Sequence, residues 1–459
     1  MKPRIGLLTT IALAAGLHYG AAQVAFAPAV TNGVGNNPAV SAVTDVNGDG
    51  KIDLICGNAG DSPYNNGTLS ILTNIGSGSF APAATISIGH GPDGIAVADV
   101  NRDGRIDLTT ANWDNGSGNT LSVWTNRGGG DFGSNATVNV GNGPAAVIVA
   151  DVNGDGRLDL ISANYGDNTL TILTNNGSGA FGSNATNNVG SAPIDLIAVD
   201  ANGDGRPDVI SVNFGNSTLT VLTNNGTGGL GSNATVNVGS SPFSVAAVDA
   251  NGDGKPDLIS ANFGNNTLTV LTNNGSGAFG SNATLNVGNG PSSVAATDVN
   301  GDGKVDLVCA NMNVNTLSVL TNNGSGGFAL AATLGTGDPD GHVGNLPRSL
   351  LAVDVSGDGK PDLTCVNGGA NTMAVLINAT VFPSAGAAPP LTINRPGNAI
   401  RVSWPSASPG WSLQQNPDLP TSHWGPSGYS GYAIADNGTN KGLTIPFPPG
   451  SLFFRLLHP

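Results

Sequence analysis

A nine-residue pattern of carboxylates and amides, D-x-[NS]-x-D-G-x-x-D, occurs seven times between residues 45 and 362. In the third copy the side-chain oxygens belong to Asp151, Asn153, Asp155 and Asp159, with a turn at Gly156. A tight turn at the glycine lets the oxygens of positions 1, 3 and 5 converge, and the backbone carbonyl of position 7 and the carboxylate of position 9 can complete the set. Ca²⁺ takes roughly six to eight such oxygens, whereas Mg²⁺, the runner-up, prefers a stricter octahedron and retains more water.

The pattern therefore predicts a calcium loop in each copy, up to seven ions in all. Lys or Arg at position 7 is expected to contribute only its backbone carbonyl. Ser356 stands where the other copies have Asn, so the last site is expected to bind more weakly. The predicted metal residues are Asp45, Asn47, Asp49, Lys51 and Asp53; Asp99, Asn101, Asp103, Arg105 and Asp107; Asp151, Asn153, Asp155, Arg157 and Asp159; Asp200, Asn202, Asp204, Arg206 and Asp208; Asp249, Asn251, Asp253, Lys255 and Asp257; Asp298, Asn300, Asp302, Lys304 and Asp306; and Asp354, Ser356, Asp358, Lys360 and Asp362.

Two other structures compete with a calcium loop for this pattern. An EF-hand needs a Glu at position 12 and flanking helices, but position 12 here is Cys, Thr or Ser and the flanks have the pattern of strands. A metal-free turn could be held by Asp and Asn side chains bonded to local amides. Three carboxylates within nine residues repel one another, however, and 21 of the 31 acidic residues, all Asp, lie in these copies. Calcium is favoured.

The first 22 residues have the pattern of a secretory signal peptide. Lys2 and Arg4 precede an apolar run from Ile5 to about Leu17, and small residues follow to a cleavage site near Ala22. The run is shorter than the roughly 20 residues that span a bilayer, no later stretch is long enough, and no cysteine near the cleavage site suggests a lipid anchor. A secreted protein is expected. Loss of Lys2 and Arg4 changes the net charge from −15 to −17, and seven Ca²⁺ ions would bring it to −3.

The first Asp residues of the seven copies are spaced by 54, 52, 49, 49, 49 and 56 residues, a period typical of arrays and propellers. The unit between residues 242 and 291 contains four strand-like segments, "SVAAVDA", "DLISAN", "TLTVLTN" and "SNATLNVG", which we term strands A to D. Seven such antiparallel sheets favour an all-β, seven-bladed β-propeller. The seventh copy lacks strand D, and residues 26–38 resemble one. The N-terminal strand is therefore expected to close the last blade.

The expected domain order is a signal peptide (1–22), the propeller (23–380), a Pro/Ala-rich linker (381–390) and a small β-sandwich (391–459). Trp404, Trp411 and Trp424 are expected in the core of the sandwich. Cys56, Cys309 and Cys365 occupy one equivalent slot in different copies, where the other copies have Ser or Thr. They are expected to be buried and unpaired, because equivalent slots in separate repeats do not face each other.

Residues 26 to 378 resemble FG-GAP or VCBS-type repeats, which form the seven-bladed propeller of integrin α-subunits and of many secreted bacterial proteins. The resemblance rests on the acidic loop and its period, and it covers over three quarters of the chain. It implies calcium in the A–B hairpins on one face, and adhesion or recognition more often than catalysis. The C-terminal segment resembles small β-domains appended to secreted proteins of environmental bacteria. A fold by itself fixes no function.

The function expected from these patterns is a secreted, monomeric recognition or adhesion module for an extracellular or cell-surface glycan or protein, with no nucleic-acid partner. One alternative is a calcium-rigidified matrix protein. Another is a calcium-dependent polysaccharide lyase, for which His90, His342 and Arg348 are the nearby candidates. A non-enzyme is favoured, because the chain has no Glu and no nucleophile motif and most of its carboxylates lie in the loops.

Loop lengths predict where a partner binds. The B–C loops of copies one and two and the D–A connection before copy seven are longer than their equivalents by five, three and seven residues. These insertions fall on adjacent blades, opposite the calcium hairpins, although neutral variation of loop length would give the same pattern. Tyr165, Phe214 and Phe263, equivalent to Trp113, are expected to wedge between blades. The predicted ligand residues are Asp61, Tyr64, Asn65, Trp113, Asp114, Asp338, Asp340 and His342.

Overall fold

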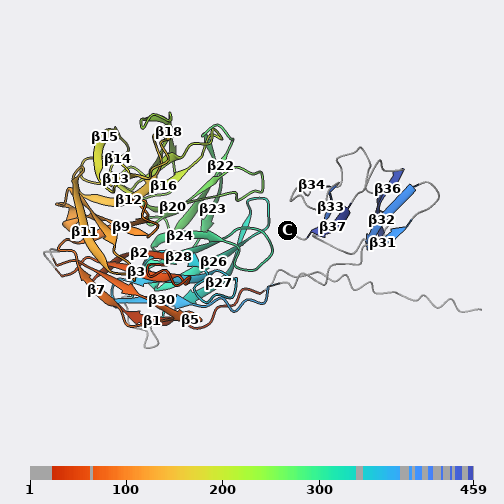
Figure 1. Cartoon of the computed structure of the whole chain (residues 1–459), viewed down its shortest axis with the longest axis horizontal. Helices are drawn as coiled ribbons and strands as arrows, with labels where there is room; N and C mark the ends of the chain where they lie inside the picture. The colour runs from red at the N-terminus through yellow and green to blue at the C-terminus, as the bar shows by residue number, and fades with distance from the viewer. Residues whose placement is uncertain are drawn as a thin grey trace, which may run out of the picture. The chain divides into compact units, whose positions relative to one another are not determined.

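The computed structural model describes residues 23–61, 66–337 and 345–382, together with seven strands of the C-terminal part. The chain divides into two compact units, Met1–Val381 and Phe382–Pro459. Within the described residues of the first unit, seven four-stranded antiparallel sheets form the blades of a β-propeller (Figure 1). The predicted all-β propeller is thus confirmed. The helical elements among these residues are two short 3₁₀ turns, η1 (Asp114–Gly116) and η2 (Met312–Val314).

Strand A of each blade lies at the centre of the ring, where the A strands of neighbouring blades contact one another. Each A strand begins at a proline, a residue that suits the first position of a strand because it has no N–H to donate. The A strands are β2 (Pro38–Thr44), β8 (Pro92–Ala98), β12 (Pro144–Ala150), β16 (Pro193–Val199), β20 (Pro242–Val248), β24 (Pro291–Thr297) and β28 (Pro347–Val353).

Strand B is buried along its whole length in every blade, from the Asp of loop position 9 to an Asn. The B strands are β3 (Asp53–Asn58), β9 (Asp107–Asn112), β13 (Asp159–Asn164), β17 (Asp208–Asn213), β21 (Asp257–Asn262), β25 (Asp306–Asn311) and β29 (Asp362–Asn367). Strand C is also largely buried. The C strands are β4 (Thr68–Leu72), β10 (Thr120–Asn126), β14 (Thr169–Asn175), β18 (Thr218–Asn224), β22 (Thr267–Asn273), β26 (Thr316–Asn322) and β30 (Thr372–Leu376).

Strand D is the outer strand, and its residues alternate between exposed and half-buried, as expected for a sheet edge that faces water on one side. Six blades take strand D from the same copy of the repeat. These D strands are β7 (Ala84–Ser87), β11 (Phe132–Asn139), β15 (Phe181–Asn188), β19 (Leu230–Asn237), β23 (Phe279–Asn286) and β27 (Phe328–Gly335). Blade one also carries a small hairpin of β5 (Asn74–Gly76) and β6 (Ser79–Phe80).

The seventh blade is completed by the N-terminal strand β1 (Val30–Gly33), as the sequence predicts. β1 pairs antiparallel with β30, from Val30 opposite Val375 to Gly33 opposite Thr372. Beyond the strand, the amide of Ala379 donates to the carbonyl of Ala25 at 2.9 Å. The two ends of the ring are therefore held in one sheet, and no C strand is left with an open edge.

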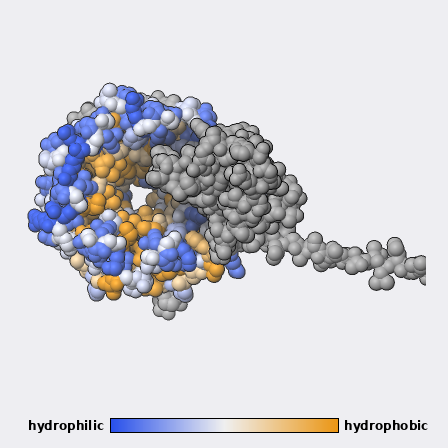
Figure 2. Space-filling model, turned by 45° about the vertical axis from the view of Figure 1, so that its right-hand side comes forward, coloured by the Kyte–Doolittle hydropathy of each residue, from blue (hydrophilic) through white to orange (hydrophobic). Residues whose placement is uncertain are grey.

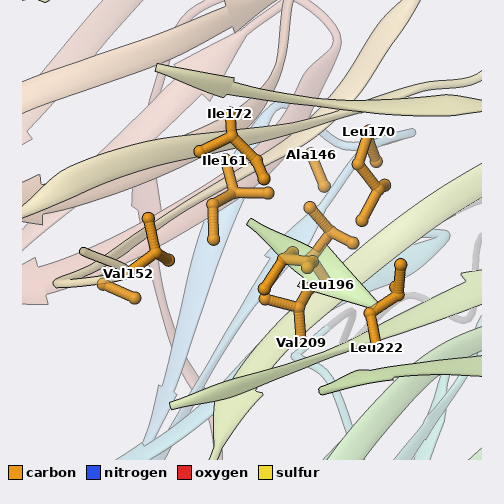
Figure 3. Packing of buried hydrophobic residues seen from close by; sticks show 11 residues of the cluster. Ala146, Val152, Ile161, Leu170, Ile172, Leu196, Val209 and Leu222 are labelled. Atoms are coloured by element: carbon orange, nitrogen blue, oxygen red, sulfur yellow. The ribbon is translucent and has the colours of Figure 1, made fainter. Parts of the chain in front are cut away.

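The core is divided among seven apolar clusters, one at each interface between neighbouring blades. At the interface of blades three and four, Ile161 and Ile172 pack with Leu196 and Val209 (Figure 3). The interface of blades seven and one has an equivalent cluster, which includes Met373. The ring is thus closed by the same kind of apolar packing that joins consecutive blades.

The three cysteines are buried and unpaired in these interfaces, as predicted. Burial raises the pKa of the Cys365 thiol to about 12 and shifts those of Cys56 and Cys309 upward as well, so none of the three is a reactive thiolate at neutral pH.

The described strands of the second unit form one four-stranded and one three-stranded antiparallel sheet. The sandwich predicted there stays a prediction, because Trp411, Trp424 and most neighbouring residues lie outside the described part. No helix in the described residues has the length and apolar character to cross a membrane. The strands are β31 (Thr392–Asn394), β32 (Ala399–Pro405), β33 (Ser412–Asn416), β34 (Gly425–Pro426), β35 (Ala435–Asp436), β36 (Asn440–Pro446) and β37 (Phe453–Leu457).

Candidate metal loops and the opposite face

Each acidic loop connects strand A to strand B, and backbone amides hold its carboxylates in place. In the third loop, Asp151 Oδ1 accepts the N–H of Asp155 at 3.2 Å, and its Oδ2 accepts the N–H of Gly156 at 2.8 Å. Asn153 Oδ1 accepts the same Asp155 N–H at 2.9 Å. Gly156 has φ of +77°, a conformation that L-residues rarely adopt. The glycine thus provides the tight turn that brings positions 1, 3 and 5 together.

The Asp at position 9 is buried and anchors the loop to its blade. Asp159 Oδ2 accepts the Val152 N–H at 3.1 Å, and Oδ1 accepts the Asn175 N–H at 2.8 Å. The equivalent pair of bonds is present in all seven loops. Burial raises the pKa of these carboxyls against the opposing effect of the two N–H bonds, for Asp306 to about 6. Position 9 therefore has a structural role besides the ligand role predicted for it.

The side chain at position 7 has a partner that the sequence analysis missed. In every loop the Lys or Arg at position 7 forms an ion pair with the Asp at position 5, with N–O distances from 2.6 Å for Arg105–Asp103 to 3.7 Å for Lys304–Asp302. The backbone N–H and ammonium of Lys51 hold the pKa of Asp49 below its usual range. Three Asp and one cation leave six of the loops with a charge of −2, which one divalent cation would neutralise, and Arg102 at position 4 makes the charge of the second loop −1.

The donors of the loops fit a hard divalent cation. The side chains offer oxygen alone, and an ionised carboxylate has about four lone-pair sites, of which Asp151 uses three for N–H groups. No group of three His, Cys, Asp or Glu side chains in the described residues is gathered as a metal cluster. Coordination of a cation would therefore depend on the side-chain oxygen at position 3 and the backbone carbonyl at position 7 as much as on the carboxylates. Calcium remains a prediction.

The seventh loop differs at position 3. In loops one to six the Asn Oδ1 accepts the N–H of position 5. In loop seven the Ser356 hydroxyl instead donates to Asp354 Oδ1 at 3.2 Å. One of the four lone-pair sites of Asp354 is thereby used within the loop, which is the physical basis for expecting weaker binding there.

In six of the seven blades, an Asn at or just beyond the end of strand C links neighbouring loops around the ring. Asn175, which is 4% exposed, donates from Nδ2 to the carbonyl of Val100 in the preceding blade at 2.8 Å. Asn74 donates to Val355 at 2.8 Å across the junction of blades one and seven. Four further interfaces have the same bond. The signal was present in the sequence, because an Asn occupies this position in all seven copies, but its role appears only when the blades are assembled.

The opposite face carries the B–C and D–A loops, and we term it the B–C face. Of the eight predicted ligand residues, Asp61, Trp113 and Asp114 are described, whereas Tyr64, Asn65, Asp338, Asp340 and His342 lie outside the described residues. Asp114 accepts the Gly91 N–H at 2.8 Å and contacts His90 Nδ1 at 2.8 Å, and Asp61 accepts from Asn36 Nδ2 at 3.0 Å. Both carboxylates therefore hold neighbouring loops together.

Trp113 lies at the mouth of the central channel. Its ring packs edge-on against Tyr165 of the next blade, with centroids 5.1 Å apart. The expected contact between blades is therefore present, but Trp113, Tyr165 and Phe214 also line a pocket in the channel. Phe263 contacts Phe243, a further lining residue, at 5.8 Å.

Comparison with known proteins gives the family. The model of the FG-GAP-like repeat matches residues 45–110, 99–162, 151–211, 200–260, 249–309 and 298–365. No curated protein matches the chain. A crystal structure of BBS1N in complex with ARL6DN, soaked with lead, is similar with a TM-score of 0.53 and 14% identity, over 78% of this chain and 99% of that one. A crystal structure of a protein from Lactobacillus plantarum has a TM-score of 0.51 and 14% identity, over 88% and 99%.

The two structural likenesses show the fold alone, since their identities are low. The family model is more specific, because its six overlapping matches run from the first acidic loop to the seventh. The chain belongs to the family of FG-GAP-like repeat proteins.

Proposed function

We propose that the chain is an exported recognition module whose seven acidic loops bind calcium and whose B–C face binds a protein partner. The observation that carries the proposal is the division of the ring into two faces. One face repeats a single acidic loop seven times, and in every copy the position 9 Asp accepts the same two N–H bonds. The other carries the insertions in which the copies differ.

The calcium part rests on charge and donor type. Each loop offers oxygen donors on a net negative charge, −2 in six loops and −1 in the second, and the position 9 Asp connects it directly to the buried strand B. A divalent ion at positions 1, 3, 5, 7 and 9 would therefore stabilise the start of strand B as well as the loop. Extracellular calcium modules bind at roughly 10⁻⁴–10⁻³ M, so at millimolar calcium each site would add about 1–2 kcal/mol to the free energy of unfolding.

The protein part rests on the scaffold. Loops carried by a rigid scaffold are common sites of binding, and a propeller of this fold is found in the complex of BBS1N with ARL6DN. Catalysis is not proposed, because the three candidates for a lyase base are not brought together in the described residues: His90 is paired with Asp114, Arg348 lines the pocket in the channel, and His342 lies outside the described part. A calcium-rigidified matrix protein would have the same loops but would need no specific B–C face.

The calcium proposal is tested by elemental analysis and thermal unfolding of the purified full chain. We expect bound calcium after dialysis against millimolar Ca²⁺, and a melting temperature that falls substantially in EDTA and recovers when Ca²⁺ is added in excess. Mg²⁺ at the same concentration is the control and should restore less of the stability. A melting temperature unchanged by EDTA, with no metal detected, would contradict the proposal.

Partner recognition is tested by substitution on the B–C face. The purified chain is cross-linked to cells, or to extracellular matrix, of the organism that produces it, and the captured proteins are identified by mass spectrometry. The same protein should be captured in each repeat of the experiment. Capture should be lost on replacement of Trp113 by Ala, whereas Asn176→Ala, on an exposed loop of the opposite face, should leave it intact. Equal capture by both variants would count against recognition by the B–C face. N-terminal sequencing of the exported protein tests the cleavage near Ala22.

A further inference from the structure

The central channel ends, on the B–C face, in a pocket of about 470 Å³. All seven A strands contribute to its wall, and Figure 2 shows apolar side chains around the opening of the ring inside a largely hydrophilic outer surface. The volume is within the range of roughly 300–1,000 Å³ typical of small-molecule sites. Of the loops that supply the B–C face with its insertions, the B–C loop of blade two contributes Trp113 to the pocket wall.

The pocket wall is where the repeats cease to resemble one another. The stretch "TLTVLTNNG" is identical in residues 218–226 and 267–275, and the position 9 Asp is the same in all seven copies. The residue after the first proline of strand A differs instead in size, polarity and charge, and in every blade it lines the pocket. These residues are Ala39, Asp93, Ala145, Ile194, Phe243, Ser292 and Arg348. Repeats that stay alike where their blades pack have therefore diversified along the wall of the channel, as they have in the lengths of the B–C and D–A loops.

Arg348 supplies the positive charge of the wall, and it is poorly satisfied. Its Nε atom is buried and has no hydrogen-bond partner. In the described part of the propeller, the other Lys and Arg residues lie in or beside the acidic loops, so Arg348 is set apart from them. A buried unpaired donor costs free energy that an incoming acceptor would recover. The arginine is therefore suited to a carboxylate, which its planar group binds through two parallel bonds.

The negative charges lie on other blades. Asp93 belongs to blade two and Asp195 to blade four, whereas Arg348 belongs to blade seven. In a ring of seven, blades seven and four are as far apart as two blades can be. Arg348 lowers the pKa of Asp93, but burial outweighs this effect and raises that pKa to about 6; burial also raises the pKa of Asp195 to about 6. Above pH 6 the wall thus has one positive and two negative charges on different sides.

The remaining wall is aromatic. Trp113, Tyr165, Phe214 and Phe243 come from blades two to five, the blades that also carry the two carboxylates. Aromatic faces favour cations and apolar groups. A purely anionic ligand would meet two carboxylates, and a purely cationic one would leave the Arg348 Nε unpaired. A ligand with both charges and an apolar part can pair with Arg348 and with a carboxylate and can pack against the aromatic side chains.

We propose that this pocket binds a small zwitterionic molecule of the α-amino acid type, with its carboxylate on Arg348, its ammonium group toward Asp93, the carboxylate with which Arg348 interacts electrostatically, and an apolar side chain against the aromatic wall. A free amino acid and the ends of a short peptide share this chemistry. The inference goes beyond the proposed function, because it concerns a small ligand and depends neither on calcium nor on a protein partner.

Isothermal titration calorimetry of the full chain at pH 7.5 tests the proposal, with the twenty free α-amino acids and the matching dipeptides as probes. At least one probe with an apolar side chain should bind with a stoichiometry near one. For that probe, the N-acetyl derivative, which lacks the ammonium group, and the amide, which lacks the carboxylate, should each bind at least tenfold more weakly. Tighter binding of the dipeptide than of the free amino acid would identify a peptide end as the source.

Two variants connect the binding to the pocket. Arg348→Gln should weaken binding of the amino acid at least tenfold, while Arg127→Gln, a change to an exposed arginine outside the pocket, should leave it unchanged. Asp93→Asn should weaken binding of the amino acid and its amide but not of the N-acetyl derivative, and this variant serves if Arg348→Gln fails to fold. The proposal would be overturned if no probe bound, or if Arg348→Gln bound the amino acid as tightly as the unmodified chain does. It would also be overturned if the N-acetyl derivative, or galacturonate as an anion without an ammonium group, bound as tightly as the amino acid.

Discussion

The Asn at the end of strand C offers the sharpest test of how the blades are joined. In Asn175→Ala, three groups lose their partner: the carbonyl of Val100 at 2.8 Å, the carbonyl of Leu158 at 3.0 Å and the N–H of Gly177 at 2.8 Å. A buried polar group left without a partner costs about 1–3 kcal/mol. At the lower end of that range for each group, we expect the free energy of unfolding to fall by about 3 kcal/mol.

Equilibrium unfolding in urea measures this loss, and the neighbouring Asn supplies a matched control. Asn176 is exposed and its Oδ1 accepts only from Ser178 within the same turn, at 2.9 Å from the amide and 2.8 Å from the hydroxyl. Asn176→Ala should therefore change the free energy of unfolding by less than about 1 kcal/mol. Asn175→Asp should be at least as damaging as Asn175→Ala, because it places a carboxylate beside two carbonyl oxygens. If Asn175→Ala and Asn176→Ala were equally stable, the bonds between blades would be incidental.

Three further predictions follow from the fold. Deletion of residues 23–36 removes β1, exposes the edge of β30 and should cause aggregation in light scattering, and a truncated chain that stayed monomeric and equally stable would refute closure by this strand. Burial raises the pKa of Asp195 to about 6, so the folded state keeps a proton that the unfolded state has lost, and the free energy of unfolding falls as the pH rises from 4 to 6. Asp195→Asn cannot titrate, so in urea unfolding its free energy of unfolding should increase by about 2 kcal/mol relative to that of the unmodified chain between pH 4.5 and pH 7.5. A difference that stayed constant with pH would contradict this. Cys56, Cys309 and Cys365 should not react with a thiol reagent until the protein unfolds, and rapid labelling of native protein would show that the interfaces are open.

The fold could be read from the sequence because local and repeated signals agree. In every copy strand B begins at the position 9 Asp and ends at an Asn. The strands predicted at 257–262 and 267–273 begin and end at those residues in the structure. The closure by the N-terminal strand followed from a missing D strand at one end and an additional one at the other. Such inferences need only periodicity, since each blade repeats the packing of the last.

The sites were harder to predict from the sequence than the fold, for a physical reason. The acidic loop is local in sequence, so its ligands could be named, but the ion pair of Lys51 with Asp49 depends on a side-chain conformation that spacing does not fix. The bond from Asn175 to Val100 crosses between blades and has no signature within one repeat. The pocket is less local still. Arg348, Asp93 and Asp195 are separated by more than 100 residues from one another and share a wall only because strand A has the same place in every blade.

The meeting of residues 25 and 379 in one blade means that the ring has no structurally required beginning. The amide of Ala25 donates to Thr380 Oγ1 at 3.0 Å and its carbonyl accepts the Ala379 N–H at 2.9 Å, so the two ends are already neighbours. A short linker there, with a new break in any D–A connection, would give a circular permutant in which the same bonds join the same blades. The order in which blades are synthesised would change, while the set of contacts that defines the folded ring would not.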